Sequence, residues 1–195
     1  YDDLVIANVG GHSLYEYTET CRRFNDCDKV FAIELNISCP NVKEGGIAFG
    51  QCASNIEHIT SAIKKIAKQP VIMKLSPNVT DIAEMARAAE AAGADALSMI
   101  NTLTGMKIDI ERRKFALANK TGGMSGPAIK PIAVRMVYQC ANAVSIPIIG
   151  MGGIASAEDA IEFLMAGATA VAAGAMNFVN PYLTEELVDG IDRFL

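Results

Sequence analysis

The sequence predicts an α/β protein with parallel strands, and among parallel folds it favours a (β/α)8 TIM barrel. Short apolar runs recur along the chain, as expected of strands that are buried on both faces. Helical patterns lie between these runs, and each run ends in a polar or glycine-rich loop. Six strands are expected where a closed barrel needs eight, so the chain is predicted to form one partial barrel domain, residues 1–195, that covers about strands three to eight.

Each expected strand is a short run dominated by valine, isoleucine, leucine, methionine and alanine. In chain order the strands are expected at Leu4–Val9, Ala32–Ile37, Val71–Leu75, Ala96–Ile100, Ile146–Ile149 and Ala170–Ala173. Because helical patterns separate them, the strands are predicted to form βαβ units, in which neighbouring strands are parallel.

The helices are predicted from apolar side chains spaced three or four residues apart and from capping residues. One apolar stripe consists of Ile56, Ile59, Ile63 and Ile66. Thr80 or Asp81 is expected to cap the next helix, which Gly93 ends. Ser156 is expected to cap a later helix, which Gly167 ends.

An open doubly wound sheet is the alternative to the barrel, and the loops distinguish the two. An open sheet concentrates its site at one switch point, whereas polar residues or glycines follow every expected strand of this chain. Two late turns, Gly152-Gly153 and Gly174-Ala175, each follow a strand and precede a helix. Backbone N–H groups in such turns bind phosphate, as the loops after strands seven and eight often do in barrels. The turns therefore favour a barrel that holds a phosphate-bearing cofactor.

Composition argues against several classes of function. The net charge is −5 and the basic residues are dispersed, so nothing indicates a nucleic-acid-binding surface. No apolar stretch is long enough to cross a bilayer. The five cysteines form no Cys-x-x-Cys pair and follow no secretory signal, which indicates reduced thiols in a cytoplasmic protein and no metal site in this chain. The two histidines are assigned no role.

The segment ELNISCPN, residues 34–41, contains the strongest candidate for catalysis. Cys39 follows an expected strand at the end where barrel enzymes keep their chemistry. A thiol acts as an acid or a base, and the carboxamides of Asn36 and Asn41 offer donors and acceptors to a planar ligand. Cysteine is also among the most buried residue types, so a packed thiol is the alternative for Cys39 taken alone.

Six blocks of the sequence resemble class 1 dihydroorotate dehydrogenase. They are ELNISCPNVKEGG (34–46), VIMKLSPNVTDI (71–82), LSMINTLTGMKID (97–109), TGGMSGPAIKP (121–131), IPIIGMGGI (146–154) and AVAAGAM (170–176). NVKEGG and INTLTGMKID resemble the class 1B catalytic subunit in particular. The family's first two βα units are not matched by any block, so the resemblance implies an N-terminally truncated chain.

The resemblance implies an FMN-dependent oxidoreductase of de novo pyrimidine biosynthesis that converts dihydroorotate to orotate. It also implies an electron-transfer partner subunit, carrying FAD and a 2Fe-2S cluster, that passes the electrons to NAD. The assembly implied is a heterotetramer of two catalytic and two partner subunits.

The resemblance further implies roles for individual residues. Cys39 would be the base that removes a proton from carbon 5 while a hydride passes from carbon 6 to flavin nitrogen 5. The substrate-contacting positions are matched by Asn36, Asn41, Asn101 and Thr102. The FMN-contacting positions are matched by Asn8, Asn36, Lys74, Ile100, Gly126, Gly152, Gly153, Gly174 and Ala175. Lys74 would lie near the polar edge of the flavin and favour its anionic reduced form, rather than extend to solvent as a generic strand lysine does.

Two other functions are compatible with parts of the pattern. A dihydropyrimidine dehydrogenase-like barrel, acting on dihydrouracil or dihydrothymine, shares the SCP cysteine, the lysine strand and the late glycines, but it differs just after SCP. A non-catalytic phosphate-binding barrel would keep Gly152-Gly153, yet it gives no reason to align Cys39, Lys74 and Asn101 at separate strand ends. The long segment from Asn101 to about Gly122 is expected to help shape and cover the site of the enzyme that the resemblance implies.

Overall fold

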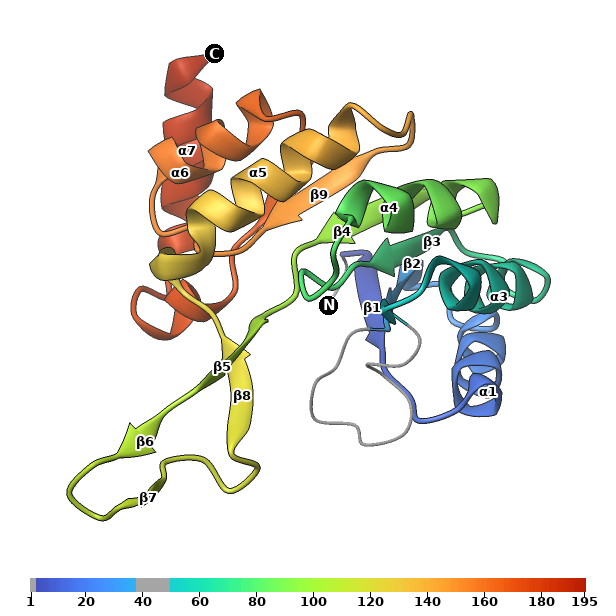
Figure 1. Ribbon diagram of the computed structural model, residues 1–195. Helices are drawn as coiled ribbons and strands as arrows, with labels where there is room; N and C mark the ends of the chain where they lie inside the picture. The colour runs from blue at the N-terminus through green and yellow to red at the C-terminus, as the bar shows by residue number, and fades with distance from the viewer. Residues whose placement is uncertain (1–2, 38–49) are drawn as a thin grey trace.

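The structure, a computed structural model, describes residues 3–37 and 50–195. Its centre is a six-stranded parallel sheet in the order β1-β2-β3-β4-β9-β10 (Figure 1). The strands are β1 (Val5–Val9), β2 (Val30–Asn36), β3 (Val71–Lys74), β4 (Ala96–Met99), β9 (Ile148–Met151) and β10 (Ala170–Ala172). All six confirm the predicted strands, with boundaries that differ by two residues at most.

The helices that connect these strands follow the predicted caps. They are α1 (Leu14–Phe24), α3 (Ala53–Lys64), α4 (Ile82–Ala91), α5 (Lys130–Ala141), α6 (Ala157–Met165) and α7 (Leu183–Phe194). Asp81 accepts backbone N–H bonds at the start of α4, and the Ser156 hydroxyl accepts one from Asp159 at the start of α6. Gly93 and Gly167 follow α4 and α6 with φ of 93° and 105°, the left-handed conformation that favours glycine after a helix.

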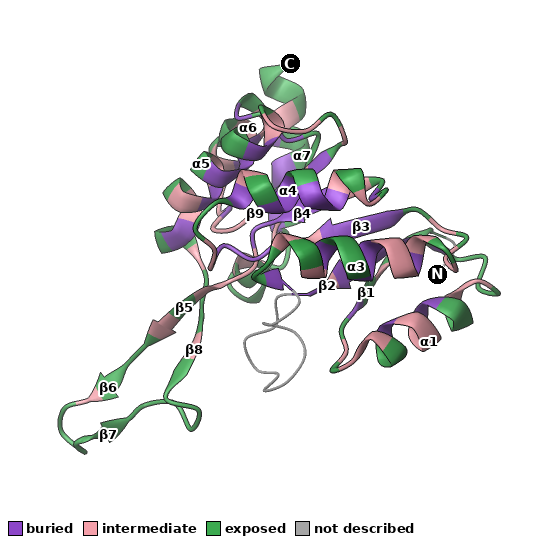
Figure 2. Ribbon diagram, turned by 45° about the vertical axis from the view of Figure 1, so that its right-hand side comes forward, coloured by how far each residue is buried: buried purple, intermediate pink, exposed green. Residues whose placement is uncertain are grey.

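The two faces of the sheet differ in chemistry because successive side chains of a strand point to opposite faces. Leu35 and Met73 are neighbours in β2 and β3 and are fully buried in the core shared with the helices. Figure 2 shows the buried residues gathered between the helices and the sheet. The neighbouring pairs on the opposite face are polar toward the strand ends, namely Asn8 with Glu34 and Asn36 with Lys74. This polar face is the interior of the predicted barrel.

The segment after Asn101 forms an antiparallel arm. Strand β5 (Leu103–Met106) pairs with β8 (Thr121–Met124), and β6 (Ile108–Asp109) pairs with β7 (Lys114–Phe115). The arm extends away from the sheet (Figure 1). We expected the segment from Asn101 to about Gly122 to help shape and cover the site. Its first residues, Asn101 and Thr102, line the cavity described below, whereas the paired strands satisfy their backbone hydrogen bonds with each other and do not cover it.

The sheet remains open within the described residues, with β1 and β10 at its two edges. Leu4, Val5 and Ile6 lie at the first edge with 60%, 46% and 49% of their surfaces exposed. Apolar side chains at an unpaired edge are what a barrel would cover with its next strand. The curved parallel sheet with helices on its outside therefore matches part of a barrel. None of the helices in the described ranges has the length and apolar character required to span a bilayer.

Candidate active site

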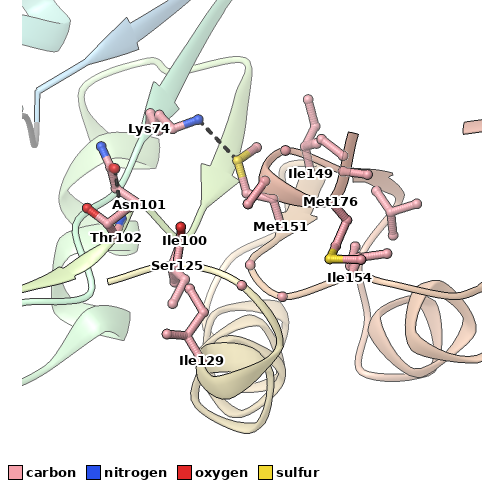
Figure 3. A pocket seen from close by; sticks show the side chains of 18 of the residues that line it. Lys74, Ile100, Asn101, Thr102, Ser125, Ile129, Ile149, Met151, Ile154 and Met176 are labelled. Atoms are coloured by element: carbon pink, nitrogen blue, oxygen red, sulfur yellow. Dashed lines mark hydrogen bonds between the residues drawn. The ribbon is translucent and has the colours of Figure 1, made fainter. Parts of the chain in front are cut away.

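A cavity of about 780 Å³ lies at the carboxyl ends of the sheet strands, where its lining side chains converge (Figure 3). Its apolar lining includes Ile100, Ile129, Ile149, Met151 and Ile154. Its polar lining includes Glu34, Lys74, Asn101, Thr102 and Ser125, and glycines from three loops contribute backbone. A largely apolar cavity of this size with a few convergent polar groups is typical of a small-molecule or cofactor site.

Lys74 places a positive charge on one wall of this cavity. It occupies the last position of β3, and its side chain is only 15% exposed. Its Nζ lies 3.4 Å from Glu34 Oε2 and 3.1 Å from Met151 Sδ. The side chain therefore turns into the cavity, which contradicts the alternative of a lysine that extends to solvent (Figure 3).

Asn36, Asn101 and Thr102 form a hydrogen-bonded group beside Lys74. Asn101 Nδ2 donates to Asn36 Oδ1 at 3.0 Å, and the Thr102 backbone N–H donates to Asn101 Oδ1 at 2.8 Å. Asn78 supports the group from the next loop, since its Nδ2 donates to the Thr102 carbonyl at 3.0 Å. Tyr17, a fully buried residue of α1, donates its hydroxyl to the Asn36 carbonyl at 2.8 Å. These bonds orient amides and a hydroxyl, the groups that suit a ring with both carbonyls and N–H groups.

Gly152 and Gly153 line the opposite wall in a conformation that requires glycine. Their φ angles are 127° and 85°. A Cβ on Gly153 would lie 2.8 Å from the Gly126 carbonyl oxygen and 2.9 Å from the Lys130 nitrogen, both backbone atoms. A Cβ on Gly152 would lie 3.2 Å from Ile100 Cγ1. The two glycines therefore let the turn after β9 pack directly against the loop that starts α5.

The remaining predicted cofactor positions leave space beside this turn. A Cβ on Gly126 or Gly174 would meet no atom within 4 Å, although both residues line the cavity. Ala175 also lines it, at the start of the 3₁₀ helix η2 (Ala175–Phe178). Backbone exposed in this way fits a bound phosphate group, which is recognised through N–H groups at such turns.

An ion-pair cluster holds together the loops that carry Gly152, Gly153 and the start of α5, which we call the glycine wall. Lys130 Nζ lies 2.6 Å from Asp159 Oδ1 and 2.7 Å from Glu162 Oε2, and Asp159 Oδ2 accepts the Ala155 N–H at 2.9 Å. Partial burial raises the pKa of Asp159, but the hydrogen bonds from Lys130 and from the backbone outweigh it, so the pKa lies below its ordinary value. The hydrogen bonds to Asp159 and Glu162 raise the pKa of Lys130. The cluster thus fixes the start of α5 against the turn that precedes α6.

The structure brings most of the predicted site residues to one cavity. Its lining includes Lys74, Ile100, Asn101, Thr102, Gly126, Gly152, Gly153, Gly174 and Ala175. Asn36 reaches the group through its hydrogen bond to Asn101. Asn8 does not line the cavity among the described residues; it donates instead to Glu34. Cys39 and Asn41 lie outside the described residues, so their predicted roles stay predictions.

Glu34, Asn78 and Lys130 were not predicted as site residues. Glu34 could have been found, because it interrupts an apolar run and lies two residues before Asn36, on the same face of β2. Asn78 and Lys130 carry no such signal, since each acts on residues that are distant in sequence.

Comparison with known proteins agrees with this geometry. The family model described as dihydroorotate dehydrogenase matches residues 2–195. A relative from Lachnoclostridium phytofermentans is 68% identical over all 195 residues, and one from Alkaliphilus oremlandii is 57% identical over the same length. Both carry the name "Dihydroorotate dehydrogenase B (NAD(+)), catalytic subunit". The chain spans 65% and 64% of the length of these two relatives.

Proposed function

Because the chain belongs to the dihydroorotate dehydrogenase family, we propose that it forms the FMN-binding catalytic domain of an enzyme that oxidises dihydroorotate to orotate. This reaction belongs to de novo pyrimidine biosynthesis. The observation that carries the proposal is that one cavity has Lys74 and the hydrogen-bonded asparagines on one wall and the Gly152-Gly153 turn on the other. Experiments are best made on the protein at the full length of its relatives, which we call the full-length chain.

The residues present fit FMN. Gly126, Gly152, Gly153 and Gly174 expose backbone on which the phosphate would rest, and a Cβ on Gly126 or Gly174 would fill that space. Ile100 and the neighbouring apolar side chains offer a wall for the ring system. Lys74 supplies a cation that favours a negatively charged, reduced ring. FMN, when bound, supplies the acceptor for the two electrons of the oxidation.

The chain's own residues orient the substrate and move its proton. In the proposed site Asn36, Asn41, Asn101 and Thr102 bind the carbonyl and N–H groups of the dihydropyrimidine ring. Cys39 then removes the proton from carbon 5 as the general base. General bases typically contribute about 10²- to 10⁴-fold to a rate. Asn8 and Ile100 are proposed to contact the flavin. The Asn8 amide is held for this contact by its hydrogen bond to Glu34.

We also propose a partner subunit with FAD and a 2Fe-2S cluster, in a heterotetramer of two catalytic and two partner subunits that delivers electrons to NAD. Support comes from the relatives, which are named as NAD(+) enzymes and as catalytic subunits. Within the described residues no cluster of three or more His, Cys, Asp or Glu side chains is positioned to hold a metal ion. A cytoplasmic location is part of the proposal.

The test is a spectroscopic titration of the full-length chain. We expect the purified chain to carry stoichiometric FMN, and dihydroorotate to bleach its absorbance under anaerobic conditions. Dihydrouracil at the same concentration serves as the control and should leave the spectrum unchanged. Bleaching by dihydrouracil but not by dihydroorotate would reassign the chain to a dihydropyrimidine dehydrogenase-like barrel, and a colourless protein that binds no FMN would reject both enzymes.

A further inference from the structure

The cavity contains one buried carboxylate that the proposed mechanism does not use. Among the described residues that line it, Glu34 and Lys74 are the only charged ones. Glu34 retains only 9% of its surface exposed, although its side chain is acidic. A carboxylate is expensive to bury unless it is paired and hydrogen-bonded, so its partners indicate what it is there for.

Within residues 3–37 and 50–195, Glu34 has two hydrogen-bond partners, and both donate to the same oxygen. Oε2 accepts from Lys74 Nζ at 3.4 Å and from Asn8 Nδ2. The three residues come from three adjacent strands, β3, β2 and β1, with Glu34 in the middle. An ammonium and an amide directed at one oxygen suit an ionised carboxylate, which only accepts hydrogen bonds. Glu34 is therefore the fixed point from which Lys74 and Asn8 are positioned.

Lys74 has donor capacity left for a ligand. An ammonium carries three N–H donors. Among the described residues, its recorded partners are Glu34 and the Met151 thioether, and the thioether is a weak acceptor. One of the three donors therefore remains for a ligand, and the side chain lies on the wall of the cavity (Figure 3).

We propose that Glu34 is a positioning residue that holds the Lys74 ammonium at the cavity wall and moderates its charge toward the bound flavin. This inference rests on the proposed function, because it assigns the cavity to FMN. A cation close to the flavin binds the electron-rich reduced form more tightly than the oxidised form, and a neighbouring anion offsets part of that preference. Glu34 thus sets the flavin's reduction potential lower than Lys74 alone would, while keeping the ammonium in place.

Glu34→Gln and Lys74→Met are expected to shift the potential in opposite directions. Glutamine retains an oxygen that accepts from Lys74 and removes only the charge. In the flavin-loaded full-length chain, Glu34→Gln should make reduced FMN bind about tenfold more tightly relative to oxidised FMN. The reduction potential of the flavin should therefore shift by about +30 mV, the value of a tenfold change for a two-electron couple. Lys74→Met should shift the potential to negative values. A Glu34 that only supports the fold would not raise the potential.

The measurement is an anaerobic titration of the flavin against reference dyes in the wild type and in each variant. Lys64→Met is the matched control. Its ammonium also pairs with a carboxylate, Asp95 Oδ2 at 2.6 Å, but it lies outside the cavity lining, so its removal should leave the potential unchanged. An unchanged or lowered potential in Glu34→Gln overturns the proposal.

A second measurement on the flavin-free full-length chain tests the pair without reference to FMN. Brief acetylation at neutral pH, followed by peptide mass spectrometry, reports how readily each lysine amine reacts. Glu34→Gln should increase the acetylation of Lys74 several-fold relative to Lys64 in the same sample, since the charge that holds the ammonium is gone. Equal acetylation of Lys74 in the wild type and the variant overturns the charge pairing between Glu34 and Lys74 on which the proposal rests. A wild type that shows this pairing but binds no FMN would overturn the proposed function and the flavin part of the inference together.

Discussion

Gly153→Ala should destabilise the protein and abolish the glycine wall of the cavity. Gly153 has a φ of 85°, which costs an L-residue roughly 1–2 kcal/mol. The new Cβ would also lie 2.8 Å from the Gly126 carbonyl oxygen and 2.9 Å from the Lys130 nitrogen. Backbone atoms cannot turn aside as a flexible side chain does, and such overpacking costs about 1–3 kcal/mol. The free energy of unfolding should therefore fall by roughly 2–5 kcal/mol.

Urea unfolding of the flavin-free full-length chain measures this change. Gly10→Ala is the matched control, because its Cβ would meet no atom within 4 Å and its φ lies outside the left-handed region, so its unfolding free energy should stay within about 0.5 kcal/mol of the wild type. Gly174→Ala separates packing from ligand binding. Its Cβ also meets no protein atom, so stability should be kept while FMN affinity falls at least about tenfold. A Gly153→Ala protein as stable as Gly10→Ala would refute the reasoning.

Four further predictions concern other parts of the molecule. Lys130→Met should lower the unfolding free energy by about 1–3 kcal/mol, because Asp159 loses a charged hydrogen-bond partner. Because the pKa of Asp159 is lowered in the folded state, ionised Asp159 stabilises the wild type above about pH 4, and this stabilisation is lost as the pH falls further. The unfolding free energy of the variant should therefore depend less steeply on pH in this acid range. Iodoacetamide should label the exposed Cys52, because hydrogen bonds from Ser54 and the backbone lower the pKa of its thiol. It should label the buried Cys140 far more slowly, because burial raises the pKa of that thiol to about 12. Equal labelling rates would contradict this prediction. Cys39→Ala should keep FMN but lose about 10²- to 10⁴-fold in single-turnover bleaching by dihydroorotate, and an unchanged rate would remove the thiol from the mechanism. Residues 1–195 alone should melt without cooperativity and hold little FMN, whereas the full-length chain should melt cooperatively and hold FMN; a cooperative melt with stoichiometric FMN for the short form would show that its open edges are tolerated.

Local signals were sufficient for the elements of the fold. The six strands, the caps at Asp81 and Ser156 and the helix-ending Gly93 were predicted correctly, because each depends on the residue itself and its near neighbours. The glycines of the turn after β9 were recognisable as a turn for the same reason, and their positive φ angles are those of a turn that needs glycine. The family resemblance extended this to the residues that would line one cavity.

The direction of the arm was not predictable from local signals. The stretch from 103 to 124 contains apolar residues that would suit a cover over the site, yet Ile110 and Phe115 remain exposed on an arm that leaves the body. Whether such a paired segment lies over the cavity or extends from the sheet depends on contacts with residues that are distant in sequence. No sequence pattern within the segment predicts its direction.

The amino-acid sequence by itself determined that parallel strands alternate with helices and that polar groups follow the strands. Tertiary structure alone decided which of these groups meet. Glu34 binds residues 26 and 40 positions away in the chain, Asn8 and Lys74, and Asn78 supports Thr102 from 24 positions away. The contacts of Glu34 arise from the register of neighbouring strands, since a shift of one residue in a strand would turn its side chains to the opposite face. The contact of Asn78 depends on how the loops after β3 and β4 meet. Register is a property of the assembled sheet, and so the charge balance of the cavity appears only when the strands are paired.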